Sequence, residues 1–128
     1  MILCDTNIII DLLKFDNELV KQNYSQIGAK NLAINPIIFA EIFRGIKKNE
    51  SKIVLKHLSA YNLLKFTPEV TDIFIELIRK YAHSHNNDSQ IPDLLIAATA
   101  IHYNCELYTK NIKDFTFIEE LKIYNPIE

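Results

Sequence analysis

Residues 1–10, MILCDTNIII, are the stretch that decides the fold. The apolar run at residues 2–4 is too short for a helix and is cut off by three polar residues, a pattern that predicts a buried β-strand leading into a turn. Asp5 then stands at the carboxyl end of this strand, the edge at which open α/β sheets form their ligand crevice. A second interpretation stays open, because an aspartate here also serves well as the N-cap of a following helix.

The rest of the chain alternates short apolar runs with amphipathic segments. Further strands are predicted at residues 32–34, 63–66, 106–109 and 122–124. Helices are predicted at residues 7–14, 17–27, 36–48, 51–61, 69–83 and 93–103, with loops at residues 84–90 and 110–114. This alternation predicts one α/β domain over residues 1–128, with a central parallel sheet of about five short strands and helices on both faces.

Composition limits the possible functions. The 128 residues are 48% hydrophobic, which supplies a packed core, and the net charge of −2 gives no global basic field for nucleic acid. Any contact with RNA or DNA would therefore depend on a local patch. No apolar run of about 18 residues could span a membrane and no signal peptide is recognisable, so we expect a soluble cytoplasmic protein. Cys4 and Cys105 lie in apolar strands and are predicted to be buried free thiols.

Four carboxylates are the candidate functional groups. Strand ends and the following helix starts share one edge of a parallel sheet, so Asp5, Asp93 and Asp114 are expected there. Glu41 lies in the predicted helix 36–48, on a face expected to turn inward, where an unpaired carboxylate is costly. Without histidine or cysteine nearby, these acids suit a hard divalent cation such as Mg²⁺ or Mn²⁺. Phosphodiester hydrolysis is the chemistry that uses such a site.

Each acid also has a purely structural explanation. Glu41 can pair with Arg44 or lie on the surface at the edge of the apolar stripe. Asp93 can interact with the dipole of its own helix, and Asp114 can be a turn residue. Asp11, on the first helix, is interpreted as a solvated residue.

The segments CDTNIII, NPIIFAEIFRGI, IPDLLIAATA and LYTKNIKDF, in this order, cover essentially the whole chain. Together they resemble the PIN-domain ribonucleases, in particular the VapC-type toxins of bacterial toxin–antitoxin pairs. The resemblance implies a three-layer PIN-like fold, a homodimer and a small antitoxin partner encoded nearby. It also implies that the catalytic, metal-binding set is Asp5, Glu41, Asp93 and Asp114, and that the supporting polar residues are Thr6, Asn7, Thr109 and Asn111. Asn35 departs from the serine that is usual in the family, but both residues cap a helix.

The leading hypothesis is a metal-dependent endoribonuclease that acts on RNA as a toxin. The alternative is a non-catalytic PIN domain that binds RNA or protein, although all four acids are present. A phospho-acceptor receiver domain would need an aspartate after the third strand, where the chain has Phe66-Thr67-Pro68, and a haloacid-dehalogenase-type phosphatase would need one at Asn7. A local basic rim for RNA is expected from the following residues: Lys14, Arg44, Lys47, Lys48, Lys110 and Lys113.

Asn111 and Asp114 compete for the fourth position of the acidic set. Electrostatics favours Asp114, because an asparagine adds no negative charge. A one-turn segment that starts at Asn111 and is anchored by Phe115 would bring Asp114 back over the edge of the sheet.

Overall fold

The computed structural model describes residues 1–81 and 90–126, and within them four parallel strands form one sheet. The strands are β1 (Ile2–Cys4), β2 (Leu32–Ile34), β3 (Asn62–Leu63) and β4 (Glu106–Tyr108), in the order β3-β2-β1-β4. Leu3 of β1 pairs with Ala33 on one side and with Leu107 on the other. The first residues of the chain thus form a central strand, as predicted.

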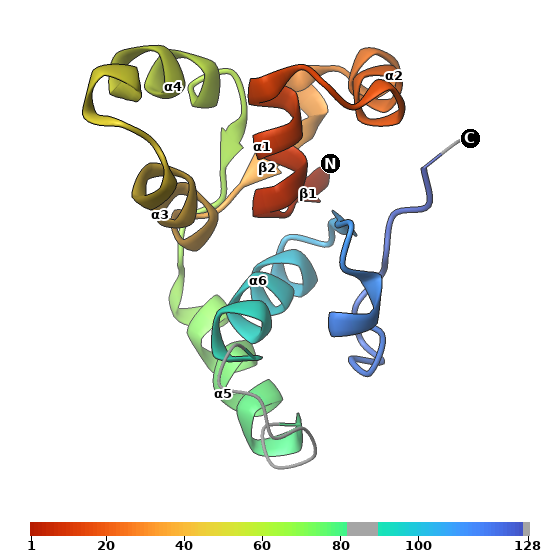
Figure 1. Cartoon of the computed structure of the whole chain (residues 1–128). Coiled ribbons are helices and arrows are strands. Elements are labelled where there is room, and N and C mark those ends of the chain that lie inside the picture. Colours follow the sequence, from red (N-terminus) through yellow and green to blue (C-terminus); the bar gives the residue numbers. More distant parts are fainter. Residues whose placement is uncertain (82–89, 127–128) are drawn as a thin grey trace.

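Helices connect these strands. Those longer than one turn in the described residues are α1 (Thr6–Lys14), α2 (Glu18–Ile27), α3 (Pro36–Gly45), α4 (Ser51–Leu58), α5 (Pro68–Tyr81) and α6 (Gln90–His102). Right-handed crossovers place α1 to α4 on one face and α5 and α6 on the other. Figure 1 shows α1, α2 and α4 grouped apart from α5 and α6. The predicted α/β architecture around a parallel sheet is therefore confirmed.

Local signals set where the first helices begin and end. Asp5, Asn17 and Asn35 are the N-caps of α1, α2 and α3, and each side-chain oxygen accepts a hydrogen bond from a backbone N–H of the first turn. Gly28 follows α2 with a φ of 85°, a conformation that favours glycine. These residues separate one helix from the next element without help from the core.

Two helices end three residues earlier than predicted. α3 ends at Gly45, a poor helix former, and Ile46 is already extended. A single turn, Lys48–Glu50, separates α3 from α4. α4 ends at Leu58, where the Ser59 hydroxyl donates to the carbonyl of Lys56 at 2.6 Å and satisfies a carbonyl of the last turn.

The other differences concern the strands and α6. β3 covers Asn62–Leu63 instead of residues 63–66, because its partner β2 ends at Ile34 and leaves no strand for the last predicted residues. α6 begins at Gln90, three residues before the predicted start. Residues 82–89, which include the end of the predicted helix 69–83 and most of the predicted loop 84–90, lie outside the described residues.

The predicted strand at residues 122–124 is reduced to one parallel bridge between Leu107 and Ile123. Leu107 N donates to Lys122 O, and Tyr124 N donates to Leu107 O, both at 2.9 Å. The Tyr124 ring then packs against Tyr108 at a centroid distance of 4.9 Å. The prediction of about five strands was therefore too high by one for the described residues, since this segment extends the sheet by one bridge and is held by its side chains.

One hydrophobic cluster joins the sheet to both groups of helices. Three alanines of α6, Ala97, Ala98 and Ala100, are fully buried in this cluster, and their small side chains let the helix approach the sheet closely. Cys4 and Cys105 are buried free thiols, as predicted, and burial raises the pKa of both. None of the described helices is long and apolar enough to cross a membrane.

Candidate active site

Asp5 follows β1 directly, and hydrogen bonds hold its carboxylate from two sides. Oδ1 accepts from the backbone N–H of Thr6 at 2.8 Å, so Asp5 does cap α1. Oδ2 accepts from the hydroxyl of Thr109, the residue after β4, at 2.7 Å. The residue is only 7% exposed, and burial raises the pKa of its carboxyl although both hydrogen bonds act to lower it. Asp5 is therefore both a helix cap and a buried carboxylate at the edge of the sheet.

Glu41 of α3 is linked to Asp5 through Thr6. The Thr6 hydroxyl donates to Glu41 Oε1 at 3.0 Å, which connects α1 to α3. The expectation that Glu41 lies on the inward face is wrong, because its side chain is exposed. Ile38 and Ile42 form the buried face of α3, and Glu41 lies beside that face, at the rim of the site.

The other three acids contribute to a raised pKa of Asp93, which lies in the first turn of α6. Partial burial is the largest cause that raises the pKa of its carboxyl to about 7, and the negative charges of Asp5, Asp114 and Glu41 add to it in that order. The structure therefore brings the four predicted carboxylates into one electrostatic field. They come from four separate segments: the end of β1, the middle of α3, the start of α6 and the turn after β4.

Asp114 lies in a one-turn 3₁₀ helix, Ile112–Asp114, within the segment predicted as a loop. Phe115 beside it is 1% exposed and anchors this turn in the core, as expected. Asp114 itself is exposed, and its charge raises the pKa of both Asp5 and Asp93. Asn111 stands before the turn, but its side chain makes no capping hydrogen bond.

No cation among the described residues forms an ion pair with any of the four acids. None of the ion pairs among the described residues includes any of them, so the expected alternative pair between Glu41 and Arg44 is absent there. In the same residues, no three histidine, cysteine, aspartate or glutamate side chains are arranged so that they could hold a metal ion. Asp5 and Asp93 are the inner members of the set, and Glu41 and Asp114 are exposed at its rim.

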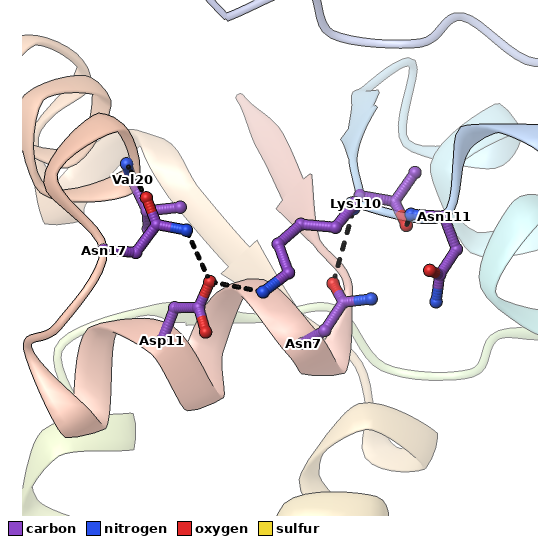
Figure 2. Close-up of polar contacts among 7 residues, drawn as sticks. Asn7, Asp11, Asn17, Val20, Lys110 and Asn111 are labelled. Carbon is purple, nitrogen blue, oxygen red and sulfur yellow. Dashed lines mark hydrogen bonds and ion pairs between the residues drawn. The ribbon is translucent and has the colours of Figure 1, made fainter.

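The predicted supporting residues fall into two groups. Thr6 and Thr109 bond the acids directly, and the Thr109 hydroxyl also accepts from Asn111 N at 3.0 Å. Asn7 lies on α1, facing the loop after β4, and its Oδ1 accepts from Lys110 N at 3.5 Å (Figure 2). Asn7 therefore contacts the loop that carries Asp114, and Asn111 belongs to that loop. Within the described residues, neither side chain is hydrogen-bonded to an acid of the site.

Asp11 is not the solvated residue that we expected. Its side chain is 13% exposed, and Oδ2 lies 2.7 Å from the Lys110 ammonium nitrogen. Asn17 Nδ2 donates to the same oxygen at 3.0 Å, and Figure 2 shows both side chains directed at Asp11. Lys110 thus fastens the loop after β4 to α1 and is engaged with Asp11. The four-residue spacing from Asn7 to Asp11, which puts both on one face of α1, is the sequence signal for this contact.

A buried polar pair that the sequence did not reveal joins the end of β2 to α6. Asn35 and Thr99 are both 0% exposed, and Asn35 Nδ2 donates to the Thr99 hydroxyl at 3.0 Å. Thr99 in turn donates to Leu95 O at 2.8 Å. A hydrogen bond between buried side chains has a narrow geometry, so this pair fixes how α6, and Asp93 at its start, sit against the sheet.

Comparison with known proteins identifies the family. The model of the PIN domain matches residues 2–118. The chain is 32% identical to ribonuclease VapC of Rickettsia bellii over 131 aligned positions, which cover 95% of this chain and 93% of the relative. It is 33% identical to ribonuclease VapC1 of Methanocaldococcus jannaschii, over 97% of this chain and 87% of the relative.

Solved structures agree with this result. A toxin–antitoxin complex from Klebsiella pneumoniae superposes with a TM-score of 0.80 at 29% identity, over 100% of this chain and 99% of that chain. VapBC2 from Rickettsia felis, solved with a DNA fragment from their promoter, gives a TM-score of 0.80 at 30% identity, over 98% of both chains. Because the family model spans most of the chain and the two VapC ribonucleases named above are 32% and 33% identical to it, the chain belongs to the PIN-domain family and, within it, to the VapC ribonucleases.

Proposed function

We propose that this protein is a Mg²⁺- or Mn²⁺-dependent endoribonuclease and the toxin of a toxin–antitoxin pair. The observation that carries this proposal is the convergence of Asp5, Glu41, Asp93 and Asp114 at one edge of the sheet. None of them is paired with a cation among the described residues. So much uncompensated negative charge, part of it buried, suits a divalent cation and a phosphodiester substrate.

The donor set fits such a cation in kind. The four carboxylates offer only oxygen atoms, and a bound cation would relieve the repulsion that raises the pKa of Asp93. Asp5, Glu41, Asp93 and Asp114 would hold it. The side chains of Glu41 and Asp114 are exposed at the rim, and Glu41 accepts one hydrogen bond there, from the Thr6 hydroxyl. When bound, the cation supplies positive charge for the scissile phosphate and makes water more acidic.

Neighbouring residues of the chain orient the carboxylate of Asp5. Thr6 N and the Thr109 hydroxyl hold the two oxygens of Asp5, and the Thr6 hydroxyl holds Glu41. The Lys110–Asp11 ion pair fastens the loop that carries Thr109 to α1. Side chains held in this way need little rearrangement when substrate binds, which lowers the cost of reaching the transition state.

An antitoxin and a second copy of the chain are the proposed protein partners. The solved relatives include toxin–antitoxin complexes. A groove of about 450 Å³ between α1, α3 and α4 offers a mainly apolar surface for a helix or strand of the antitoxin. Ile53 on its wall is 74% exposed. A partner segment here would lie on α3, the helix that carries Glu41, and could place a basic residue over the acids.

The metal requirement can be tested by titration. After treatment with EDTA, we expect the protein to leave a labelled single-stranded RNA uncut and to regain cleavage as Mn²⁺ or Mg²⁺ is added. Asp114→Asn should raise the Mn²⁺ concentration for half-maximal cleavage by roughly ten- to a hundredfold, because it removes a negative charge from the ligand set. Asn111→Ala should change it less, because the Asn111 side chain caps nothing and adds no charge.

Two outcomes would contradict these assignments. Equal cleavage in excess EDTA would remove the metal from the mechanism. An unaffected Asp114→Asn enzyme beside an impaired Asn111→Ala enzyme would move the fourth position to Asn111. The melting curve of Asn111→Ala should match the parent because Asn111 is exposed, and Asp114→Asn should melt no lower than the parent because it relieves repulsion on Asp5 and Asp93.

Asp93→Asn should make the metal-free protein more stable at pH 8 while it removes activity. The raised pKa means that ionised Asp93 destabilises the folded state, and this cost appears as pH rises from about 4 to about 7. We expect the free energy of unfolding to rise by about 2 kcal/mol. This is about half of what the full pKa shift would give, because the side chain is half-buried and solvent screens part of the effect. This gain exceeds the lost helix-dipole interaction of about 0.5 to 1 kcal/mol.

The measurement is the melting temperature in EDTA at pH 8 and at pH 4. A net increase of roughly 4 °C is expected at pH 8 and none at pH 4, where the parent Asp93 is protonated. A lower melting temperature at pH 8 would show that the helix-dipole interaction of Asp93 outweighs repulsion in the acidic set.

A further inference from the structure

A hollow beside the acidic site has an arginine on its wall. The hollow measures about 260 Å³ and is lined by Ile37, Ala40, Glu41 and Arg44 of α3 and by Pro92 of α6. Glu41 belongs to the acidic site, and Pro92 immediately precedes Asp93. The hollow therefore begins where the site ends, and it bridges the two helices that carry Glu41 and Asp93.

Arg44 is exposed and forms no ion pair with another described residue. It lies three residues after Glu41, so both side chains emerge from the same face of α3. No ion pair or hydrogen bond between described side chains uses its guanidinium group, and Glu41 accepts from Thr6 instead. Its guanidinium group is therefore accessible, beside Glu41, to an anion that reaches the edge of the acidic site.

Two of the other basic residues expected around the site, Lys110 and Lys14, are placed less favourably. Lys110 is engaged with Asp11, at 2.7 Å. Lys14 lines the apolar groove between α1, α3 and α4, apart from this hollow. Arg44 is the member of the expected basic rim that shares a described hollow with one of the acids.

We propose that Arg44 binds a backbone phosphate of the RNA next to the scissile one, with the flanking nucleotide in the hollow. This inference rests on the proposed ribonuclease function. Four carboxylates repel a polyanion, so a strand that crosses them needs a cation at the edge of the site. A guanidinium group suits this role, because its planar fork binds two phosphate oxygens at once. Arg44 is thus a substrate-binding residue that governs affinity for the RNA strand.

Binding can be separated from cleavage by working in the inactive Asp5→Asn protein with EDTA present. The probe is a fluorescein-labelled single-stranded RNA of mixed sequence, about 12 nucleotides long, and its anisotropy is followed at several salt concentrations. Arg44→Ala should weaken binding about tenfold and reduce the slope of log K against log salt by about 0.7, the value for one lost contact to a single strand. Arg44→Lys should keep the slope and recover part of the affinity, because it retains the charge and loses the fork.

Lys30→Ala is the matched control. Lys30 precedes β2, at the opposite edge of the sheet, and its exposed side chain can lose the same positive charge without touching the site. We expect its RNA affinity to equal that of the parent. In the active protein, Arg44→Ala should raise KM about tenfold and change kcat by less than about twofold, because a contact made equally in the bound and transition states affects only binding.

Loss of the nuclease activity and loss of the Arg44 contact would appear in different measurements. RNA that binds and is never cut by the active protein would contradict the proposed nuclease function and leave the affinity test valid. Unchanged affinity and salt slope in Arg44→Ala, the same loss in Lys30→Ala, or no binding of the RNA probe would each overturn the role of Arg44. If Arg44→Ala leaves the affinity and the salt slope unchanged, the anion that binds Arg44 would have to come from a protein partner.

Discussion

Asp5→Asn is expected to lower RNA cleavage by on the order of 10³-fold while the fold stays intact. Asparagine is also a good N-cap, so its side-chain oxygen can still accept from Thr6 N at the start of α1. Its amide group can donate to the Thr109 hydroxyl, which now accepts in place of donating. The substitution therefore removes the charge of the innermost carboxylate and leaves the local hydrogen bonds in place.

The measurement is the initial rate of cleavage of an end-labelled RNA in Mn²⁺, together with circular dichroism and a melting curve. Glu106→Gln is the matched control, because it removes one exposed carboxylate at the start of β4, the edge of the sheet opposite to the site. It should cleave like the parent. An Asp5→Asn protein that is folded and fully active would reduce Asp5 to a helix cap and end its role in the reaction.

Expression of the protein alone in bacteria should arrest growth, the second large effect that we expect. Each nuclease molecule cleaves many RNA molecules in succession, so a small number of them would cut a large share of the target RNA. The expected readouts are a fall in colony counts after induction and new RNA 5′ ends that appear before growth stops. Co-expression of a small protein encoded next to the gene should restore growth, by covering the acids from the groove between α1, α3 and α4.

Asp5→Asn at the same protein level is the control for this experiment, since it keeps the surfaces for the partner and removes the reaction. Normal growth and unchanged RNA ends after expression of the folded parent protein would contradict the toxin role. Arrest by both proteins would point to an effect of binding alone, and would favour the non-catalytic alternative.

Much of the fold followed from signals that act within a few residues. The apolar run before Asp5 identified β1. The structure then shows that Asn17, Asn35 and Gly28 set the limits of the first helices. These signals are reliable because a cap or a turn is satisfied by its own neighbours in the chain. The later errors have other causes. α4 ends where the Ser59 hydroxyl bonds a carbonyl of the last turn, and the predicted fifth strand is limited to one bridge with β4.

The candidate site divides in the same way. The sequence by itself predicted that Asp5, Asp93 and Asp114 reach one edge of a parallel sheet, because strand ends and helix starts must meet there. Only the tertiary structure decided that Glu41 is exposed, that Asp11 holds Lys110, and that Asn35 bonds Thr99. The last two contacts join residues 99 and 64 positions apart. The physical reason is that hydrophobic periodicity tells which face of a helix is buried, whereas the packing angle between elements sets which polar side chains meet at its margin.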